Sequence, residues 1–538
     1  MHKGYLCIVL HAHLPYMRHP EYDYFLEENW LYEVMTETYI PLLDLLERLI
    51  NDGINFKITL SLSPPLIEMF NDELLRARYT RYIDQLINLT EQEMQRTKGD
   101  IHFEPIVRMY RKKFRRVKYL FEDIYRKDLV AAFRTLQDTD KIEIIPSAAT
   151  HAFLPNLSIQ PHAVKVQIKV GCEQYSKNFG KKPQGMWLPE CGFAPGFDHY
   201  LREYEVKFFF IDTHGIVYGQ PMPQFSVYTP ILCPGGVAAF GRDIYSSKQV
   251  WSSREGYPGD SVYRDFYRDI GFDLDLEYLK SHLHTNMIRT FTGLKYYRVT
   301  GKTDKKEPYV SHTARKKAKE HANDFVIKKD LQIQFLSELF KARKASFKPI
   351  VTATYDAELF GHWWFEGLEW LESVLRKMGS NQKSLTTITP SEYLNHQGCS
   401  IACLPVCQPS LSSWGDKGYN EVWLNASNDY VYRHLLKATE RMINLADTFS
   451  DAKGILKRSL NQAAREVLLS QQSDWTFIMK SGTATQFAKK CFQEHVSRFN
   501  RIYHSVINKR VSEKWLREIE LRDRIFRDID YRIYRSNN

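Results

Sequence analysis

The sequence predicts an α/β protein built on a parallel β/α barrel, with an inserted helical segment and a C-terminal helical domain. Over the first 400 residues, short apolar or alternating segments recur between longer helical patterns, which is typical of strands and helices around a parallel sheet. Polar residues of catalytic type directly follow several of these segments. Beyond residue 400 the apolar periodicity becomes helical.

Seven segments are predicted as strands. The clearest is Phe56–Leu62, in which apolar and polar residues alternate along the chain. The full set is 5–10, 56–62, 142–145, 185–188, 207–211, 237–240 and 349–354. Between the first two, apolar residues at helical spacing predict a crossover helix: Leu31, Met35, Tyr39, Leu42 and Leu46.

Polar side chains stand just past the ends of several predicted strands. These residues are His11, His13, Ser63, His151, Glu190, Asp212, His214 and Asp356. In a closed parallel barrel the carboxyl ends of all strands share one face, so residues far apart in the sequence converge there. The pattern therefore predicts a complete or incomplete β/α barrel with its site on that face.

The remaining segments predict the domain organisation. Residues 65–135 interrupt the alternation with long helical patterns, so we expect a mostly helical inserted subdomain within a catalytic domain of residues 1–400. Its basic run, residues 111–118, could suggest nucleic acid, but such runs are usually solvated helix faces and no nucleic-acid motif accompanies it. Residues 401–538 are predicted as a helical domain from two apolar stripes: Leu435, Met442 and Leu445, then Leu456, Leu460, Ala463 and Val467.

Composition favours a compact protein of the cytoplasm. Hydrophobic residues make up 43% and aromatic residues 14%, and the net charge of +10 is spread along the chain. The apolar run before His11 is too short for a signal peptide, and no stretch approaches the roughly 20 apolar residues of a membrane span. Eight cysteines without a secretory pattern indicate reduced thiols. Cys399, Cys403 and Cys407 are evenly spaced but lack a nearby histidine or second cysteine pair, which disfavours a metal site.

Two carboxylates stand at strand ends among aromatic residues. Glu190 follows a strand, close to Trp187 in a turn rich in Gly and Pro, and Asp356 precedes Trp363 and Trp364. Sugar rings stack on aromatic faces, and retaining glycosidases place two carboxyl groups about 5 to 5.5 Å apart. Glu190 and Asp356 are the candidate pair, although Glu190 could equally be a surface glutamate near a core tryptophan. Glu358 and Glu366 compete for the second role, and we expect Glu358 to bond structurally behind the site.

The pair His11 and His13 admits three interpretations. Residues two apart on a strand point to the same side, and paired histidines at the end of a first barrel strand can bind a divalent metal. His151 and Asp356 could complete the ligand set of a metallohydrolase. Neutral histidines also donate hydrogen bonds to sugar hydroxyls. Others have no ligand and simply make their hydrogen bonds within the protein core or at the rim of the barrel. No catalytic lysine or second histidine pair supports the metal interpretation.

The aromatic residues outside these motifs have open interpretations. Residues 241–259 are predicted as a long loop carrying Tyr245, Trp251 and Tyr257, which fits a lid over the site or an ordered surface loop. Trp414, Trp423 and Trp475 could be further stacking platforms, or they could pack in the core as most tryptophans do.

Five motifs in order resemble glycoside hydrolase family 57, in particular its cytoplasmic α-glucan branching enzymes and amylase-like members. They are His11-Ala-His-Leu-Pro15, the segment Glu143 to His151 with Pro155, Trp187-Leu-Pro-Glu190-Cys191, the segment Tyr355-Asp356-Ala-Glu358-Leu-Phe-Gly-His362-Trp363-Trp364, and Ser473-Asp474-Trp475. The resemblance covers nearly the whole chain.

The resemblance implies an incomplete seven-stranded (β/α) barrel and a retaining enzyme without metal or cofactor, with Glu190 as nucleophile and Asp356 as acid/base. It implies a sugar-binding set of His11, His13, His151, Trp363, Trp414, Trp423 and Asp474. The implied function is a 1,4-α-glucan branching enzyme of glycogen biosynthesis, acting on amylose or a glycogen-like glucan. The alternatives are an α-amylase or 4-α-glucanotransferase of the same family and, from another class, a metal-dependent hydrolase using His11 and His13.

One departure concerns the product. Many branching members of the family carry Trp before Arg-Val-Thr, whereas this chain has Tyr296-Tyr297-Arg298-Val299-Thr300. Tyr297 can still stack on a sugar, so it stays in the predicted binding set, while the balance of branching, hydrolysis and disproportionation is left open.

Overall fold

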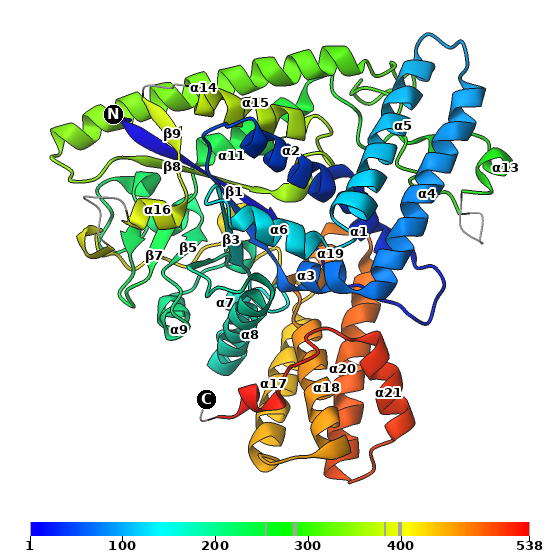
Figure 1. Cartoon of the computed structure of the whole chain (residues 1–538). Coiled ribbons are helices and arrows are strands. Elements are labelled where there is room, and N and C mark those ends of the chain that lie inside the picture. Colours follow the sequence, from blue (N-terminus) through cyan, green and yellow to red (C-terminus); the bar gives the residue numbers. More distant parts are fainter. Residues whose placement is uncertain (1, 253–254, 283–287, 381–383, 396–400, 537–538) are drawn as a thin grey trace.

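The computed structural model describes residues 2–252, 255–282, 288–380, 384–395 and 401–536. It is a mixed α/β fold with parallel sheets, followed by a C-terminal helical region that lies beneath the sheets in Figure 1. No helix in these ranges is both long enough and apolar enough to cross a bilayer.

The first sheet carries the N-terminal strand at its centre. Its strands are β1 (Gly4–Ala12), β2 (Ile58–Leu62), β3 (Ile142–Pro146), β8 (Ile350–Asp356) and β9 (Leu385–Thr387). They pair in parallel in the order β3-β2-β1-β8, and β9 pairs with the start of β1. The register places His11 opposite Ser61 on one side and opposite Asp356 on the other. Polar residues of three strands therefore lie at one level of the sheet.

The second sheet continues the same arrangement. It contains β4 (Gly185–Met186), β5 (Phe208–Ile211) and β7 (Ala238–Gly241) in parallel, with β6 (Ile231–Leu232) antiparallel to β7. A parallel bridge between Ser147 and Trp187 connects the end of β3 to the end of β4. On the other side, the Asp243 N–H donates to the Thr352 carbonyl of β8 at 2.8 Å. All seven predicted segments contain strands, and among the described residues the two strands that were not predicted are the very short β6 and β9.

The crossover from β1 to β2 is helical, as predicted. It consists of α1 (Asn29–Val34), a single π-helical turn (Met35–Tyr39) and α2 (Ile40–Asn51). The five apolar residues at helical spacing are buried: Leu31, Met35, Tyr39, Leu42 and Leu46. Their burial explains why this amphipathic segment packs on the sheet as a helix.

Helices fill the long connection between β2 and β3. They are α3 (Pro64–Asn71), α4 (Glu73–Arg96), α5 (Phe103–Tyr119) and α6 (Leu129–Gln137). The side chain of Asp72 caps α4 by accepting the N–H groups of Leu74 and Leu75. Helices α4 and α5 pack together and rise beside the sheets at the right of Figure 1.

The basic run on α5 is mostly a solvated face, as the sequence indicated. Arg111 and Arg115 both pair with Glu91 of α4. Lys113 is the exception, because its ammonium lies 4.3 Å from the centre of the Phe365 ring and burial lowers its pKa to about 8.

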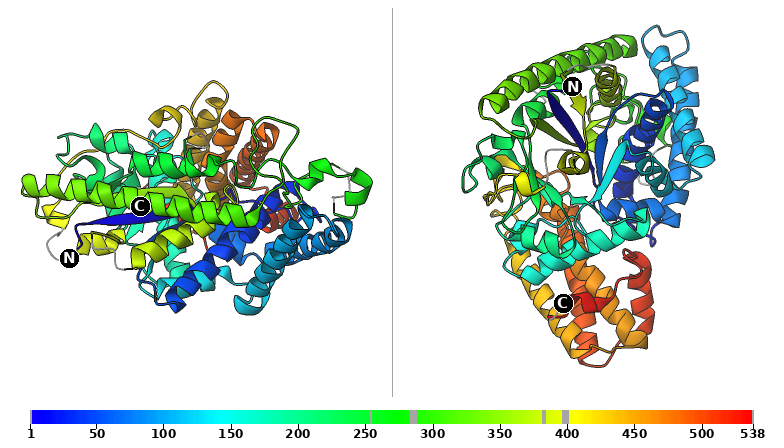
Figure 2. Two further views of the ribbon diagram at one scale, coloured as in Figure 1. Left: turned by 90° about the horizontal axis from the view of Figure 1, so that it is seen from above. Right: turned by 60° about the vertical axis from the view of Figure 1, so that its left-hand side comes forward.

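Helices follow most of the remaining strands. These are α7 (Leu154–Leu157), α8 (Pro161–Phe179), α9 (Phe197–Glu203), α10 (Thr213–Val217), α15 (Gly367–Gly379) and α16 (Pro390–Asn395). Between β7 and β8 the chain forms α11 (Ile244–Trp251), α12 (Ile270–Asp273), α13 (Leu276–Leu279) and the long α14 (Ser311–Ala342), which lies across the top of Figure 1 and can be followed in Figure 2.

The prediction of a loop over 241–259 is wrong for its first half. Residues 244–251 form α11, and the Asp243 carboxylate caps it by accepting the Ser246 N–H at 2.9 Å. An aspartate one residue before a helical turn is a strong N-cap signal. A second short turn, Tyr257–Gly259, is a 3₁₀ helix.

The C-terminal region is helical, with α17 (Tyr430–Thr448), α18 (Gly454–Ser470), α19 (Ser473–Ser481), α20 (Thr485–Ile507) and α21 (Glu513–Arg522). The right view of Figure 2 shows these helices gathered below the sheets. The predicted stripes are buried at Leu435, Met442, Leu445, Leu460, Ala463 and Val467. One continuous apolar cluster joins residues of β1 and α2 to residues of α18, so the two regions share a core.

Candidate active site

Three histidines form the floor of the candidate site at the strand ends. His11 Nδ1 lies 3.0 Å from the Ser61 hydroxyl, and its Nε2 lies 2.8 Å from Nε2 of His151. His13 Nδ1 bonds the Ser63 hydroxyl at 2.9 Å, and its ring stacks on His151 with centres 3.6 Å apart. Burial holds the pKa values of His11 and His151 well below their usual range. Both rings are therefore neutral at physiological pH.

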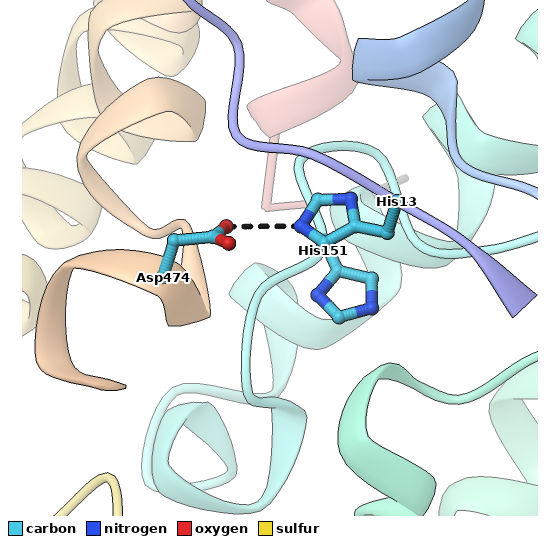
Figure 3. Close-up of side chains that lie close together, drawn as sticks. All are labelled: His13, His151 and Asp474. Carbon is cyan, nitrogen blue, oxygen red and sulfur yellow. Dashed lines mark hydrogen bonds and ion pairs between the residues drawn. The ribbon is translucent and has the colours of Figure 1, made fainter. Parts of the chain in front are cut away.

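Helix α19 brings the C-terminal region into the same site. Figure 3 shows Asp474 reaching from this helix to His13, whose Nε2 lies 3.0 Å from Oδ2. The neighbouring Ser473 hydroxyl lies 3.0 Å from His151 Nδ1 and donates to Glu190 Oε1 at 3.1 Å. Sequence reasoning gave Ser473 no role of its own, although it stands in the Ser-Asp-Trp motif.

Glu190 is held by two hydrogen-bond donors. Besides Ser473, the Trp414 indole N–H donates to Glu190 Oε2 at 2.7 Å, and the Trp414 backbone N–H donates to the Glu190 carbonyl at 3.0 Å. The side chain retains 15% of its exposure. Burial raises the pKa of Glu190 to about 7, and the two donors act against this rise.

Asp356 is the last residue of β8 and is partly buried. Its pKa is raised well above the usual range, first by burial and then by the charges of Glu358 and Glu190, while Arg242 lowers it. Among the described residues, no hydrogen-bond donor reaches its carboxylate. The two carboxyl groups therefore interact electrostatically, but of the two only Glu190 accepts hydrogen bonds from described residues that stabilise its ionised form. Asp356 consequently holds a proton more tightly than Glu190.

Glu358 and Glu366 have structural partners. Glu358 Oε1 accepts the His13 N–H at 3.0 Å and the Tyr39 hydroxyl. Glu366 is 1% exposed and accepts the Arg264 N–H at 3.3 Å. Both carboxyls lie behind the site and neither is open to a substrate.

A large cavity extends from the segment that follows Asp356. Its volume is about 1010 Å³, and its lining includes Leu359, Trp363, Trp251, Phe266 and Tyr267. Trp251 of α11 and Trp363 are each more than 40% exposed, and their rings meet edge to face with centres 5.7 Å apart. Several of the charged lining residues are paired, as in the Lys306 contact with Asp265 at 2.8 Å. Exposed aromatic faces suit a ligand that itself has apolar faces.

Three tryptophans of the predicted binding set are buried. Trp187 is 0% exposed and stacks under His11, with ring centres 4.7 Å apart. Trp423 stacks on Phe153, and the indole of Trp475 donates to the Leu469 carbonyl at 2.8 Å. Since none of these rings has an open face, the burial contradicts the expectation that they stack directly on a sugar. They support the site by packing.

The remaining aromatics of the prediction do not gather into one lid. The Tyr257 hydroxyl donates to Asp324 of α14 at 2.7 Å, which fixes it on that helix. Tyr297 is partly buried and packs against Phe103, while Tyr245 is 65% exposed. Trp251 alone of the three predicted lid residues lines the large cavity.

The hydrogen bonds of His13 and His151 bear on whether the histidines bind a metal. One donor atom from each of His13, His151 and Asp474 lies within 4.8 Å of the others. Both ring nitrogens of His151 already have partners, Ser473 and His11, and both of His13 have partners in Ser63 and Asp474. A cation at this point would have to replace several of these hydrogen bonds. Of the three regularly spaced cysteines, Cys399 lies outside the described residues and Cys407 is buried.

Comparison with known protein families gives two matches along the chain. Residues 7–400 match Glycosyl hydrolase family 57. Residues 434–534 match the C-terminal region of 1,4-alpha-glucan branching enzymes. The first match alone spans more than half of the chain, and it includes every strand of both sheets except the start of β1.

Individual relatives are branching enzymes or an alpha-amylase according to their names. The chain is similar to a 1,4-alpha-glucan branching enzyme of Thermococcus kodakarensis, with 32% identity over 100% of this chain and 79% of the relative. Among solved structures it resembles the alpha-amylase AmyC of Thermotoga maritima, with 40% identity, a TM-score of 0.91 and 99% of each chain covered. It also resembles a GH57-type branching enzyme of Pyrococcus horikoshii, with 32% identity, a TM-score of 0.87 and coverage of 100% and 97%.

Proposed function

Because the chain belongs to Glycosyl hydrolase family 57, we propose that it is a retaining 1,4-α-glucan branching enzyme with Glu190 as nucleophile and Asp356 as acid/base. Its substrate is an α-1,4-glucan such as amylose or a glycogen-like chain. Relatives named as branching enzymes match over the full length, and the C-terminal helices match the corresponding region of such enzymes.

One observation supports the roles of the two carboxyls: Glu190 accepts hydrogen bonds from two donors, whereas Asp356 accepts none among the described residues. Two donors, the Trp414 indole and the Ser473 hydroxyl, stabilise the ionised form of Glu190. The carboxyl of Asp356 has no such donor among the described residues, and the charge of Glu190 favours its protonated form. A pair that shares one proton, held by one partner, is what a retaining mechanism requires at the start.

The reaction proceeds in two displacements. Glu190 attacks the anomeric carbon, the bond to the 4-oxygen breaks, and Asp356 transfers its proton to that oxygen. The glucosyl chain is now an ester of Glu190. Asp356, as a carboxylate, then takes the proton of an acceptor 6-hydroxyl while that oxygen displaces Glu190. The product carries an α-1,6 branch, and both carboxyls return to their first state.

Substrate contacts follow from the same cluster. The neutral rings of His11 and His151, together with His13 and Asp474, offer donors and acceptors to the hydroxyls of the donor sugar. Trp414 belongs to the proposed sugar-binding set through its place next to Glu190, and Trp363 offers an exposed face for stacking. The cavity beside Trp363 is large enough to hold several sugar units of a glucan.

The fold proposal is an incomplete seven-stranded (β/α) barrel formed by both sheets together. Its supports are the bridge from Ser147 to Trp187 and the hydrogen bond from Asp243 to Thr352, which join the sheets on both sides. We assign residues 1–400 to this catalytic domain, residues 65–135 to its inserted subdomain, and residues 401–538 to the C-terminal helical domain. A cytoplasmic role in glycogen biosynthesis fits the unpaired buried thiols of Cys7, Cys172, Cys191, Cys233 and Cys407.

An α-amylase is the second candidate, and two observations favour it. The alpha-amylase AmyC shares 40% identity over 99% of the chain. Tyr297 also stands where many branching members carry tryptophan. The chemistry of the first displacement is the same, and only the acceptor, water instead of a 6-hydroxyl, differs.

One experiment separates the two candidates. The protein is incubated with amylose, and free reducing ends are counted before and after treatment with a debranching enzyme. A branching enzyme gives few reducing ends before the treatment and many after it. If nearly all reducing ends are already free, the protein is an amylase, and if amylose is unchanged, both proposals fail.

A chelator tests the metal-dependent alternative. We expect unchanged activity on amylose after dialysis against EDTA, because Glu190 and Asp356 suffice for both displacements. Loss of activity that zinc or another divalent ion restores would instead support a metal at His13, His151 and Asp474.

A further inference from the structure

Arg242 stands at the carboxyl end of β7, and neither displacement described above uses it. Its Nη1 donates to Asp212 Oδ2 at 2.7 Å, and its side chain is 13% exposed. The second oxygen of Asp212 lies 3.2 Å from Nδ1 of His214. The backbone of Arg242 is fixed as well, since its N–H donates to the Ile211 carbonyl and its carbonyl accepts the Thr213 hydroxyl.

These contacts of Arg242 with Asp212, Ile211 and Thr213 place its guanidinium against Trp414, the residue that donates a hydrogen bond to Glu190. The guanidinium carbon lies 5.1 Å from the centre of the Trp414 ring, within the range of a cation–π contact. Trp414 donates two hydrogen bonds to Glu190, one from its indole N–H to the carboxylate and one from its backbone N–H to the carbonyl. The Nε of Arg242 is buried and has no hydrogen-bond partner among the described residues. The side chain is thus oriented by Asp212 at one end and by the Trp414 ring on its face.

We propose that Arg242 is a positioning residue for glycosyl transfer: held by its hydrogen bond to Asp212, it fixes Trp414 against Glu190 and keeps a permanent positive charge within electrostatic range of Asp356. This inference rests on the proposed function. It also assigns a role to Asp212 and His214, two strand-end residues that take no part in the mechanism. They hold the charge of Arg242 in place.

The charge of Arg242 has a definite effect on the first displacement, in which Asp356 gives up its proton. The groups that face Asp356 are the carboxyls of Glu358 and Glu190, the cation of Arg242, and the neutral Tyr39 and Cys191, whose pKa values are raised well above their usual range. Glu358 and Glu190 both favour the protonated acid, and Arg242 acts against them. Without the cation, Asp356 would bind its proton more tightly and release it less readily to the 4-oxygen.

The test compares two substitutions at Arg242 with one at a remote arginine. Arg242→Gln removes the charge, and Arg242→Lys keeps it. Arg458→Gln removes a partly exposed arginine charge on α18, where Arg458 pairs with Glu513 and Glu520. The dependence of kcat/KM on pH is measured with amylose, since its alkaline limb reports the pKa of the general acid. Near-ultraviolet circular dichroism checks that each variant is folded.

We expect Arg242→Gln to move the alkaline limb upward by roughly one pH unit, because the acid loses its cation. The variant should also lower kcat on the order of tenfold or more, with a smaller change in KM. Arg242→Lys should restore the wild-type limb, and Arg458→Gln should leave it in place. An unshifted limb in a folded Arg242→Gln protein overturns the inference, as does a shifted limb in Arg242→Lys.

Asp212→Asn gives a second route if Arg242→Gln does not fold. It keeps the charge but weakens the hydrogen bond that holds Arg242, so kcat should fall while the alkaline limb stays near its wild-type position. Full kcat in this variant overturns the positioning role. If the wild-type protein itself does not act on amylose, the proposed function fails, whereas an active wild type with unaffected variants rejects only this inference.

Discussion

Three residues at the candidate site have a left-handed backbone without being glycine. They are Glu190, Cys191 and His151, with φ values of 61°, 50° and 55°. Such conformations are uncommon for residues with a Cβ and tend to cluster at functional sites, where neighbouring contacts hold them. Here the turn after β4 is held by the Cys191 N–H, which donates to the Leu188 carbonyl at 2.9 Å. The tight turn directs the Glu190 carboxylate toward Trp414 and Ser473.

Removal of the proposed nucleophile, Glu190, should abolish turnover. Glu190→Gln keeps the shape of the side chain but cannot form the glucosyl ester, so we expect activity on amylose to fall by at least about a thousandfold. Glu203→Gln, at an exposed glutamate of α9 that pairs with Lys165, is the matched control and should keep wild-type activity. A Glu190→Gln protein that retains more than a few per cent of the activity would reject the assignment.

The Trp414 hydrogen bond should set the acid limb of the pH profile. Glu190 must be ionised to attack, so activity is present above its pKa of about 7 and is lost as the pH falls below it. Trp414→Phe removes a donor that stabilises the ionised form, and the acid limb should move upward by roughly half to one pH unit.

The control for this shift is Trp515→Phe on α21, where the ring lies 3.9 Å from the guanidinium of Arg501, in the C-terminal region. Its acid limb should coincide with that of the wild type. If Trp414→Phe also leaves the limb in place, the indole bond does not govern the ionisation of Glu190.

At the scale of elements, the short helix α19 connects the C-terminal region to the chemistry. Its first two residues, Ser473 and Asp474, reach Glu190, His151 and His13. The Ser473 N–H also donates to the His151 carbonyl at 3.1 Å, which fixes the start of the helix on the strand-end loop. The C-terminal helices therefore complete the candidate site and do more than cover the sheets.

Loss of the Asp474 carboxylate should weaken catalysis without unfolding the protein. A hydrogen bond to a charged group is worth about 1.5 to 3 kcal/mol, so Asp474→Ala should lower kcat/KM on amylose by about 10- to 100-fold. Glu440→Ala, an exposed position on α17 that pairs with Lys437, is the control and should behave as wild type. Equal kcat/KM in both variants would remove Asp474 from the binding set.

At the scale of the whole molecule, a buried ionic cluster ties the C-terminal helices together. Arg498 of α20 contacts Asp523 at 2.9 Å and lies 3.8 Å from Glu466 of α18. Burial and the charge of Glu466 raise the pKa of Asp523 to about 7. His495 lies beside them, and burial lowers its pKa to about 4, so it is neutral. Arg498 is the cation that contacts both carboxyls.

Replacing Arg498 should therefore destabilise this region. Arg498→Met leaves two buried carboxyls without their cation, and we expect a loss of about 3 to 5 kcal/mol of unfolding free energy. The native pKa of Asp523 lies above its unfolded value, so its contribution to stability is present at low pH and is lost as the pH rises through about 7.

The difference in Tm between variant and wild type should accordingly be larger at pH 8 than at pH 5.5. Arg517→Met, at a position 69% exposed on α21 that pairs with Glu513, is the control and should change Tm little at either pH. A pH-independent Tm difference for Arg498→Met would show that lost packing, and not charge, causes the effect.

Much of this arrangement could be predicted from local patterns. Alternation and apolar runs located the seven main strands, and helical spacing located the crossover and the C-terminal helices. The motifs around Glu190 and Asp356 identified the family, which the match over residues 7–400 confirms. The α11 helix was missed because its apolar residues are few and its cap, Asp243, lies within a polar segment.

The roles of individual tryptophans could not be predicted. Trp363, Trp423 and Trp475 are chemically alike in the sequence, yet one is exposed on a cavity and two are buried. Exposure depends on what packs against each ring, and those partners, such as Phe153 for Trp423, come from distant parts of the chain. Ser473 and Arg242 were overlooked for the same reason, since a serine or an arginine has no local pattern that marks it as a partner of a catalytic group.

The sequence by itself determined the α/β class, the strand positions and the family, because these depend on periodicity and on short motifs that every segment carries internally. Only the tertiary structure decided how Glu190 and Asp356 differ. That difference comes from Glu358, two residues from Asp356, and from Trp414, Ser473 and Arg242, which act on the two carboxyls from three distant segments of the chain. Electrostatic and hydrogen-bond environments depend on distances in space, and separation along a sequence does not encode them.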